Sequence, residues 1–138
     1  MGAEEEVGPE TLGRSTWTFL HTLAAAYPLR PSKEEQHRVQ RFMKDFAQIY
    51  PCAPCAESFQ EIIKQDPPDG RSGPAFAQWM CRVHNEVNKE IGKDLFDCSK
   101  VGEKWGVCEQ CTAHRDKLDD FKQTFKGFQS VQKMNVPR

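Results

Sequence analysis

Residues 32–64, "SKEEQHRVQRFMKDFAQIYPCAPCAESFQEIIK", contain two amphipathic segments that meet at a proline and a pair of cysteines. Ser32 and Glu35 form an S-x-x-E capping box, which is typical of a helix start. Apolar residues then recur at spacings of three and four until Pro51 stops the pattern: Val39, Phe42, Met43, Phe46, Ile49 and Tyr50. A second helix is expected to start at the cysteine pair and to turn three side chains inward: Phe59, Ile62 and Ile63. The segment thus predicts two helices that meet at the C-x-x-C pair.

Helical patterns continue on both sides. Upstream, one face of a first helix carries Leu12, Phe19, Leu20, Leu23 and Tyr27, and the prolines of "YPLRP" (27–31) end it. Downstream of the turn "DPPDG" (66–70), a fourth helix is expected from about Pro74 to Ile91, with Gly92 ending it. "CSKVGEKW" (98–105) could form a short fifth helix. Without a convincing alternating strand, the chain is predicted to be all-α, a four-helix bundle with a short fifth helix.

At 138 residues the chain is long enough for one domain with its own core. We expect a compact domain at residues 9–105 and a C-terminal arm at residues 106–138. The arm contains Cys108 and Cys111, followed by an apolar helical stripe: Leu118, Phe121, Phe125 and Phe128.

The charge balance excludes several partner classes. With 19 basic and 20 acidic side chains the net charge is −1, so we expect no general attraction to nucleic acid or to an anionic membrane. No apolar run approaches the roughly 18 residues of a membrane span. The acidic start, "MGAEEEVGPE", is expected to be neither a signal peptide nor an Arg-rich transit peptide.

Six cysteines fall into three groups: Cys52/Cys55, Cys81/Cys98 and Cys108/Cys111. Although six cysteines allow about 15 pairings, two close C-x-x-C pairs favour this scheme. A structural role suits Cys81–Cys98 best, because the loop of 16 intervening residues is worth roughly 3 kcal/mol of chain entropy. The loop between Cys52 and Cys55 is too short for such a gain.

A zinc site made of Cys52, Cys55, Cys108 and Cys111 is an alternative, since paired C-x-x-C knuckles suit tetrahedral thiolate ligation. Against it, 52 residues separate Cys55 from Cys108, and Cys81 and Cys98 would stay unexplained. A redox role has a firmer basis, because the positive end of a helix lowers the pKa of a cysteine at its N-terminus. Two such pairs favour a relay of thiol–disulfide exchange, and a relay needs a final electron acceptor, hence a cofactor.

The fourth helix offers polar groups for such a cofactor. His84 and Asn88 share one helical face, with Asn85 and Lys89 beside them. Polar groups in an otherwise apolar helix form either a buried network or a ligand site, and spacing alone leaves both open. Tryptophans such as Trp17 and Trp105 are more often core residues than cofactor walls.

Four segments resemble the Erv/ALR family of FAD-dependent sulfhydryl oxidases, close to its augmenter-of-liver-regeneration type. They are "GRSTWTFLHTLAAAYP" (13–28), "YPCAPC" (50–55), "QWMCRVHNEVNKEIGK" (78–93) and "FDCSKVGEKW" (96–105). The resemblance covers roughly residues 11–105 and includes, in the family's order, G-R-x-x-W-x-x-x-H, C-x-x-C and H-N-x-V-N between two further cysteines.

The resemblance implies a bundle that holds FAD at its mouth and forms a homodimer. Cys55 would be the sulfur next to the isoalloxazine ring, Cys52 the interchange sulfur, and Cys81–Cys98 the structural disulfide. The residues that match the family's FAD contacts are Gly13, Arg14, Trp17, His21, His84, Asn85, Val87, Asn88, Lys93 and Trp105. The family's human-type shuttle pair precedes the core, whereas here the candidate, Cys108–Cys111, follows it.

The expected function is therefore FAD-linked thiol oxidation that forms disulfides in protein substrates. Electrons would pass from the shuttle pair to Cys52–Cys55, to FAD, and then to oxygen, giving hydrogen peroxide, or to cytochrome c. The resemblance also implies protein dithiol substrates, such as an import oxidoreductase or cysteine-rich precursors. It places the protein in the mitochondrial intermembrane space, with the secretory pathway as the alternative. The rival function is a zinc-stabilised helical binding module.

Overall fold

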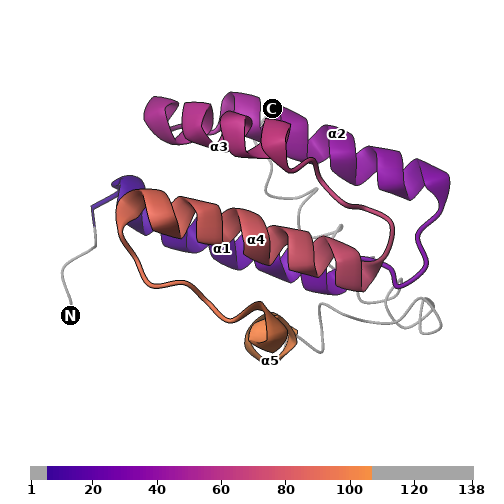
Figure 1. The fold of residues 1–138 in the computed structure, drawn as a ribbon. Coiled ribbons are helices and arrows are strands. Elements are labelled where there is room, and N and C mark those ends of the chain that lie inside the picture. The colour runs from indigo at the N-terminus through magenta and orange to yellow at the C-terminus, as the bar shows by residue number, and fades with distance from the viewer. Residues whose placement is uncertain (1–5, 107–138) are drawn as a thin grey trace, which may run out of the picture. The chain divides into compact units, whose positions relative to one another are not determined.

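The computed structural model describes residues 6–106, and all regular secondary structure in this part of the chain is helical, without a strand (Figure 1). The helices are α1 (Pro9–Ala26), α2 (Lys33–Ile49), α3 (Ala53–Gln65), α4 (Gly73–Ile91), the short 3-10 helix η1 (Cys98–Lys100) and α5 (Val101–Trp105). The predicted all-α bundle with a short fifth helix is confirmed. None of the helices in residues 6–106 combines the length and apolar character that a membrane crossing requires.

The four long helices form two antiparallel pairs (Figure 1). In one pair, α4 runs back along α1, so that Lys93, just beyond α4, meets Glu10 at the start of α1 at 3.9 Å. In the other, α3 runs back along α2, where Gln60 Nε2 donates to the Ala47 carbonyl at 3.0 Å. The short α5 packs on α1 and α4. Figure 1 shows the bend between α2 and α3 at the same end of the bundle as the N-terminus of α1.

One apolar core joins the four long helices. Trp79 and Phe76 of α4 are fully buried at its centre, and their rings are stacked 5.8 Å apart. The other buried members are Leu20, Ala24, Met43, Ala47, Phe59, Ile62, Ile63, Met80 and Val83. Burial of these side chains is the main force that holds the helices together.

Local signals account for the helix boundaries. The capping box is formed as predicted: Ser32 Oγ accepts from the Glu35 amide at 3.1 Å, and Glu35 Oε1 accepts from the Ser32 amide at 3.3 Å. Gly92 ends α4 in the left-handed conformation, with a φ of 73° that favours glycine. These ends depend only on residues within one helical turn, so the sequence alone reveals them.

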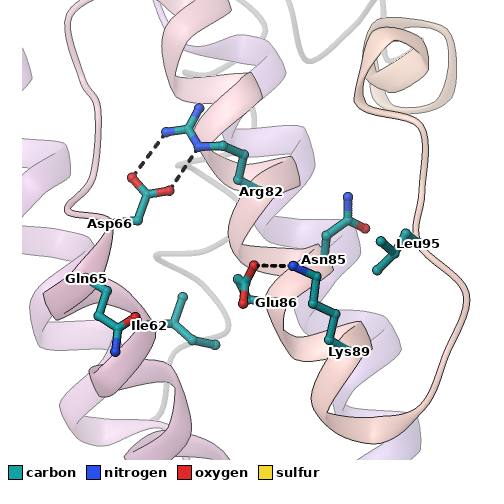
Figure 2. Close-up of a pocket in the computed structure, with 8 residues that line it drawn as sticks. All are labelled: Ile62, Gln65, Asp66, Arg82, Asn85, Glu86, Lys89 and Leu95. Carbon is teal, nitrogen blue, oxygen red and sulfur yellow. Dashed lines mark hydrogen bonds and ion pairs between the residues drawn. The ribbon is translucent and has the colours of Figure 1, made fainter.

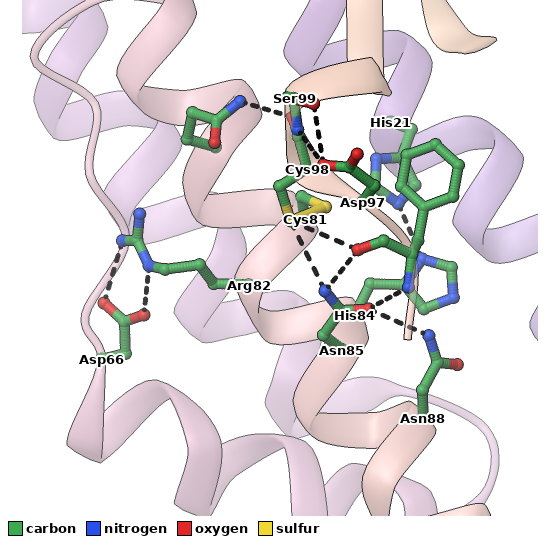
Figure 3. Close-up of a disulfide and its surroundings, with 12 residues drawn as sticks. His21, Asp66, Cys81, Arg82, His84, Asn85, Asn88, Asp97, Cys98 and Ser99 are labelled. Carbon is green, nitrogen blue, oxygen red and sulfur yellow. Dashed lines mark hydrogen bonds and ion pairs between the residues drawn. A yellow bond between two sulfur atoms is a disulfide. The ribbon is translucent and has the colours of Figure 1, made fainter. Parts of the chain in front are cut away.

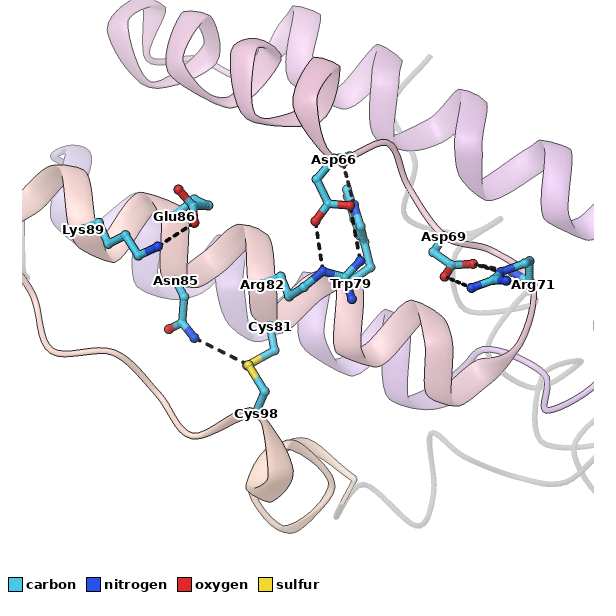
Figure 4. A network of polar contacts seen from close by, with 10 residues as sticks. All are labelled: Asp66, Asp69, Arg71, Trp79, Cys81, Arg82, Asn85, Glu86, Lys89 and Cys98. Carbon is cyan, nitrogen blue, oxygen red and sulfur yellow. Dashed lines mark hydrogen bonds and ion pairs between the residues drawn. A yellow bond between two sulfur atoms is a disulfide. The ribbon is translucent and has the colours of Figure 1, made fainter.

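The connection between α3 and α4 is held at several points (Figure 4). Trp79 Nε1 donates to the Asp66 carbonyl at 2.8 Å, and Arg82 Nε forms an ion pair with the Asp66 carboxylate at 2.9 Å. The Tyr27 hydroxyl donates to the Gly70 carbonyl at 2.7 Å. The predicted turn at residues 66–70 is thus tied to both α1 and α4.

Some residues of the predicted apolar stripes of α1 and α2 are exposed rather than buried. Phe19 is 54% exposed, and its ring contacts the edge of the Phe42 ring of α2, which is 37% exposed. Ile49, counted with the apolar positions of α2, is 77% exposed. A helical period identifies an apolar stripe, but the width of the part that is buried depends on the neighbouring helix.

Candidate functional site

A disulfide joins Cys52 and Cys55 at the bend between α2 and α3. Tyr50 leaves α2 in a non-helical conformation, and Pro51 prevents the helix from continuing. The Cys52 amide then donates to the Tyr50 carbonyl at 2.9 Å, and Cys52 itself is the N-cap of α3. Cys55 consequently lies in the first turn of α3, where backbone N–H groups without helical partners favour a thiolate over a thiol.

A cluster of four rings lies where α1, α4 and α5 meet. Trp17 and His84 are stacked with ring centroids 4.0 Å apart, and His21 and Trp105 are stacked at 4.5 Å. His21 Nε2 and His84 Nδ1 are hydrogen-bonded at 2.8 Å, which joins the two stacks. We call Trp17, His21, His84 and Trp105 the ring cluster. All four were predicted from the resemblance to contact FAD, and the fold brings them together from three helices.

Both histidines of the ring cluster favour the neutral form. Burial, then the nearby His84 and Lys104, lowers the pKa of His21 to about 3. Burial, then Lys104 and Lys93, lowers the pKa of His84 to about 4. His21 Nδ1 is, within residues 6–106, the buried side-chain nitrogen that has no hydrogen-bond partner. An unpaired buried polar atom is costly, so this position suits a ligand that supplies a hydrogen bond.

Phe59 of α3 links the ring cluster to the disulfide. Its ring meets the Trp17 ring edge-on, with centroids 6.1 Å apart. Cys55 precedes Phe59 by four residues and therefore lies on the same face of α3, one turn closer to the bend. The disulfide and the ring cluster thus border the same region of the bundle.

The second disulfide, Cys81–Cys98, ties η1 to the middle of α4 (Figure 3). Asn85, one turn after Cys81, reinforces this link: its Nδ2 donates to the Phe96 carbonyl at 2.9 Å, and its Oδ1 accepts from the Phe96 amide at 2.9 Å. Asn85 Nδ2 also lies 3.5 Å from Cys98 Sγ. The side chain of Asn85 is therefore used to hold the segment that leads to α5. Its predicted contact with FAD remains a prediction.

The other predicted cofactor residues lie on α1 and at the end of α4. Arg14 and Lys93 both approach the Glu10 carboxylate, at 3.5 and 3.9 Å. A Cβ at Gly13 would meet no atom within 4 Å, which leaves open space along this part of α1. Asn88 is buried and donates to Asn85 Oδ1 at 3.3 Å, while Val87 packs against the core.

A separate groove of about 460 Å³ runs between α3 and α4 (Figure 2). Its lining residues are Ile62, Gln65, Asp66, Arg82, Asn85, Glu86, Lys89 and Leu95. Ion pairs such as Lys89–Glu86, at 2.8 Å, already satisfy much of its charge. Asn85 is the sole predicted site residue in this groove, so the groove is distinct from the region of the ring cluster.

Within residues 6–106, no three His, Cys, Asp or Glu side chains converge as metal ligands. The zinc alternative needs four cysteines, and two of them, Cys108 and Cys111, lie outside the described residues. The predicted role of these two cysteines as a shuttle pair is therefore not tested by the structure.

Sequence reasoning missed Lys104 and the contact between Thr16 and Tyr50. Lys104 Nζ lies 5.0 Å from the centroid of the Trp105 ring and acts on the pKa values of both histidines. Its position directly before Trp105 was the one available signal. Thr16 and Tyr50, whose hydroxyl groups lie 3.1 Å apart, join α1 to the disulfide bend. Nothing in the helical spacing pointed to this contact.

Comparison with known proteins gives consistent matches. A model of the Erv1/Alr family matches residues 14–106. The FAD-linked sulfhydryl oxidase ERV1 of Arabidopsis thaliana is 43% identical over 123 residues, which is 84% of this chain and 64% of that protein. The mitochondrial FAD-linked sulfhydryl oxidase ERV1 of Saccharomyces cerevisiae is 41% identical over 96 residues, 70% of this chain and 51% of that protein.

Among solved structures, the FAD-binding domain of Erv1 from Saccharomyces cerevisiae superposes with a TM-score of 0.71 at 39% sequence identity. The match covers 73% of this chain and 96% of that domain. The chain spans about half to two thirds of the length of the two relatives named above.

Proposed function

The chain belongs to the Erv1/Alr family, and we propose that it is an FAD-linked thiol oxidase that forms disulfides in protein substrates. The observation that carries this proposal is the position of the Cys52–Cys55 disulfide. It lies at the N-terminus of α3, and Phe59, one turn further along the same face, contacts the ring cluster through Trp17. A reactive disulfide thus borders the residues that suit a planar cofactor.

The chain's own chemistry is thiol–disulfide exchange. A substrate thiolate attacks Cys52 Sγ, which breaks the Cys52–Cys55 bond and releases Cys55 as a thiolate. The second substrate thiol then displaces Cys52 from the mixed disulfide, so the substrate leaves oxidised and the protein holds two reduced cysteines. The N-terminus of α3 stabilises the Cys55 thiolate as leaving group.

The ring cluster and its neighbours fit FAD. His21 Nδ1 can take a hydrogen bond from a ligand, the tryptophans can pack on flat rings, and Arg14 and Lys93 can pair with phosphates. Open space at Gly13 permits close approach to α1. When bound, FAD supplies a two-electron acceptor that is reoxidised by oxygen, giving hydrogen peroxide, or by cytochrome c.

Cys108 and Cys111 are proposed as the shuttle pair that carries electrons from protein dithiols to Cys52–Cys55. The expected substrates are an import oxidoreductase or cysteine-rich precursors. The name of the Saccharomyces cerevisiae relative, which is mitochondrial, supports a mitochondrial location, and we propose the intermembrane space, with the secretory pathway as the alternative.

A second copy of the chain is the proposed partner of the exposed aromatic pair on α1 and α2. Phe19 and Phe42 are 54% and 37% exposed with ring centroids 6.5 Å apart, and exposed neighbouring aromatics are typical of an interface. Sedimentation equilibrium tests this: Phe19→Ser with Phe42→Ser should yield monomers. The control, Leu29→Ser, alters a 67% exposed residue elsewhere and should leave a dimer. A wild-type monomer would contradict the proposal.

The function itself is tested by the visible spectrum and oxygen uptake of the purified protein given a small dithiol. We expect a flavin band that bleaches anaerobically and returns with oxygen consumption when air is admitted. Cys55→Ser should keep the flavin band and consume no oxygen. Normal turnover in that variant, or a colourless wild-type protein carrying zinc, would refute the assignment.

The shuttle pair needs its own comparison. Cys108→Ser should spare the oxidation of a small dithiol, which can reach Cys52 directly, and should impair the oxidation of a reduced protein. Equal losses with both substrates would argue against a shuttle.

A further inference from the structure

The hydroxyl group of Tyr50 has a defined role in a hydrogen-bonded chain. Thr16 Oγ1 donates to the Leu12 carbonyl at 2.8 Å, so its single proton is already used. Tyr50 Oη lies 3.1 Å from Thr16 Oγ1. The Tyr50 hydroxyl must therefore be the donor and Thr16 Oγ1 the acceptor, which joins the end of α2 to α1.

The main chain of Tyr50 reaches the disulfide. Its carbonyl accepts from the Cys52 amide at 2.9 Å across a single intervening residue, Pro51. Tyr50 is thus bound to α1 by its side chain and to the N-cap of α3 by its backbone. A movement of Tyr50 away from Thr16 would carry Cys52 with it.

Aromatic contacts complete the connection. The Tyr50 ring lies 5.4 Å from the Phe46 ring, Phe46 lies 6.2 Å from Phe59, and Phe59 lies 6.1 Å from Trp17. Trp17 follows Thr16 directly on α1 and belongs to the ring cluster. Two adjacent residues of α1 therefore contact the disulfide bend on one side and the ring cluster on the other.

We propose that Tyr50 is a positioning residue: its hydrogen bond to Thr16 holds the Cys52–Cys55 disulfide at a fixed place relative to α1 and the ring cluster. The claim that this contact serves thiol oxidation rests on the proposed function. The claim that it holds the bend in place does not. Without the hydroxyl group the bend loses its hydrogen bond to α1 and keeps only its own backbone hydrogen bonds and its packing, so local opening at Cys52 becomes more frequent.

The first readout is the hydrogen-exchange rate of the Cys52 amide, measured by NMR in the oxidised, flavin-loaded protein. Tyr50→Phe and Thr16→Val should each raise the exchange rate about fivefold, the equivalent of one ordinary hydrogen bond. The double variant should add little to either, because both changes remove the same contact. Thr16→Ser keeps the hydroxyl group and should restore the wild-type rate.

Tyr27→Phe is the matched control, since it removes a hydroxyl that donates to the Gly70 carbonyl at the opposite end of the bundle. It should lower stability to a similar extent and leave Cys52 exchange unchanged. Equal acceleration in Tyr27→Phe, or an unchanged rate in Tyr50→Phe, would overturn the proposal.

The second readout is the rate of flavin bleaching by saturating small dithiol without air. Tyr50→Phe should slow it at least about fivefold, because even a small displacement of reacting groups lowers the rate of the step between them. Tyr27→Phe should bleach at the wild-type rate, and an equal slowing in both variants would refute the positioning role. If the wild type does not bleach, the proposed function fails, while the exchange result still decides whether Tyr50 holds the bend.

Discussion

Acidification should destabilise the protein through His21. This side chain is 2% exposed, and burial, then His84 and Lys104, lowers its pKa from 6.5 to about 3. The unfolded chain therefore takes up a proton before the folded chain does. The stabilising effect of the neutral histidine is complete above pH 6.5 and is lost progressively as the pH falls toward about 3.

The size of the effect follows from the pKa difference. One pKa unit corresponds to about 1.4 kcal/mol, and pH 5 lies about 1.5 units below the unfolded value, so His21 alone should cost about 2 kcal/mol between pH 7 and pH 5. The pKa of His84 shifts in the same direction, so its protonation in the unfolded chain adds to the loss.

This loss of stability is measured by guanidinium unfolding at pH 7, 6 and 5. Far-UV circular dichroism monitors the unfolding, and each sample has the same flavin content. His21→Gln should be less stable at pH 7, because it disturbs the buried pair, but should lose about 2 kcal/mol less than the wild type on going to pH 5. His37→Gln makes the same change at an exposed site, retains the buried pair and should keep the wild-type slope. A wild-type slope in His21→Gln would refute the reasoning.

Two further predictions concern helix starts. Gly73→Ala should lower the free energy of unfolding, measured in urea, by about 1–3 kcal/mol, because the new Cβ would lie 2.9 Å from the Tyr27 carbonyl oxygen. Gly102→Ala is the control, because a Cβ at this position meets no atom within 4 Å. Equal stability of the two variants would contradict the clash. Ser32→Ala should cost about 1 kcal/mol by thermal unfolding through loss of the N-cap, whereas Ser15→Ala, at an exposed position of α1, should cost much less; equal losses would show that the cap contributes nothing.

The helices could be predicted because their signals are local. The capping box at Ser32 and Glu35, the stop at Pro51 and the glycine that ends α4 each act within one turn. The ring cluster could be assembled only through the family resemblance. Its members come from three helices, and the spacing within any one helix does not say which residues of another helix they meet.

Contacts between helices account for what the sequence did not reveal. Phe19 belongs to the apolar period of α1 yet is 54% exposed, because the period does not say where the neighbouring helix ends. Tyr50 was counted as an apolar position, whereas its hydroxyl meets Thr16, 34 residues away. Asn85 is still a predicted FAD contact, but its hydrogen bonds to the backbone of Phe96, in the segment that folds back after α4, were not foreseen.

The pairing of Asn85 with the Phe96 backbone also bears on how the protein matures. We expect these two hydrogen bonds to form also before oxidation and to bring Phe96, and with it Cys98, against the turn of α4 that carries Cys81. The two thiols then face each other at a high effective concentration. An oxidant needs to engage only one of them, because the other is in place to displace it. Closure of this bond is therefore expected to follow docking of the segment, rather than to precede it.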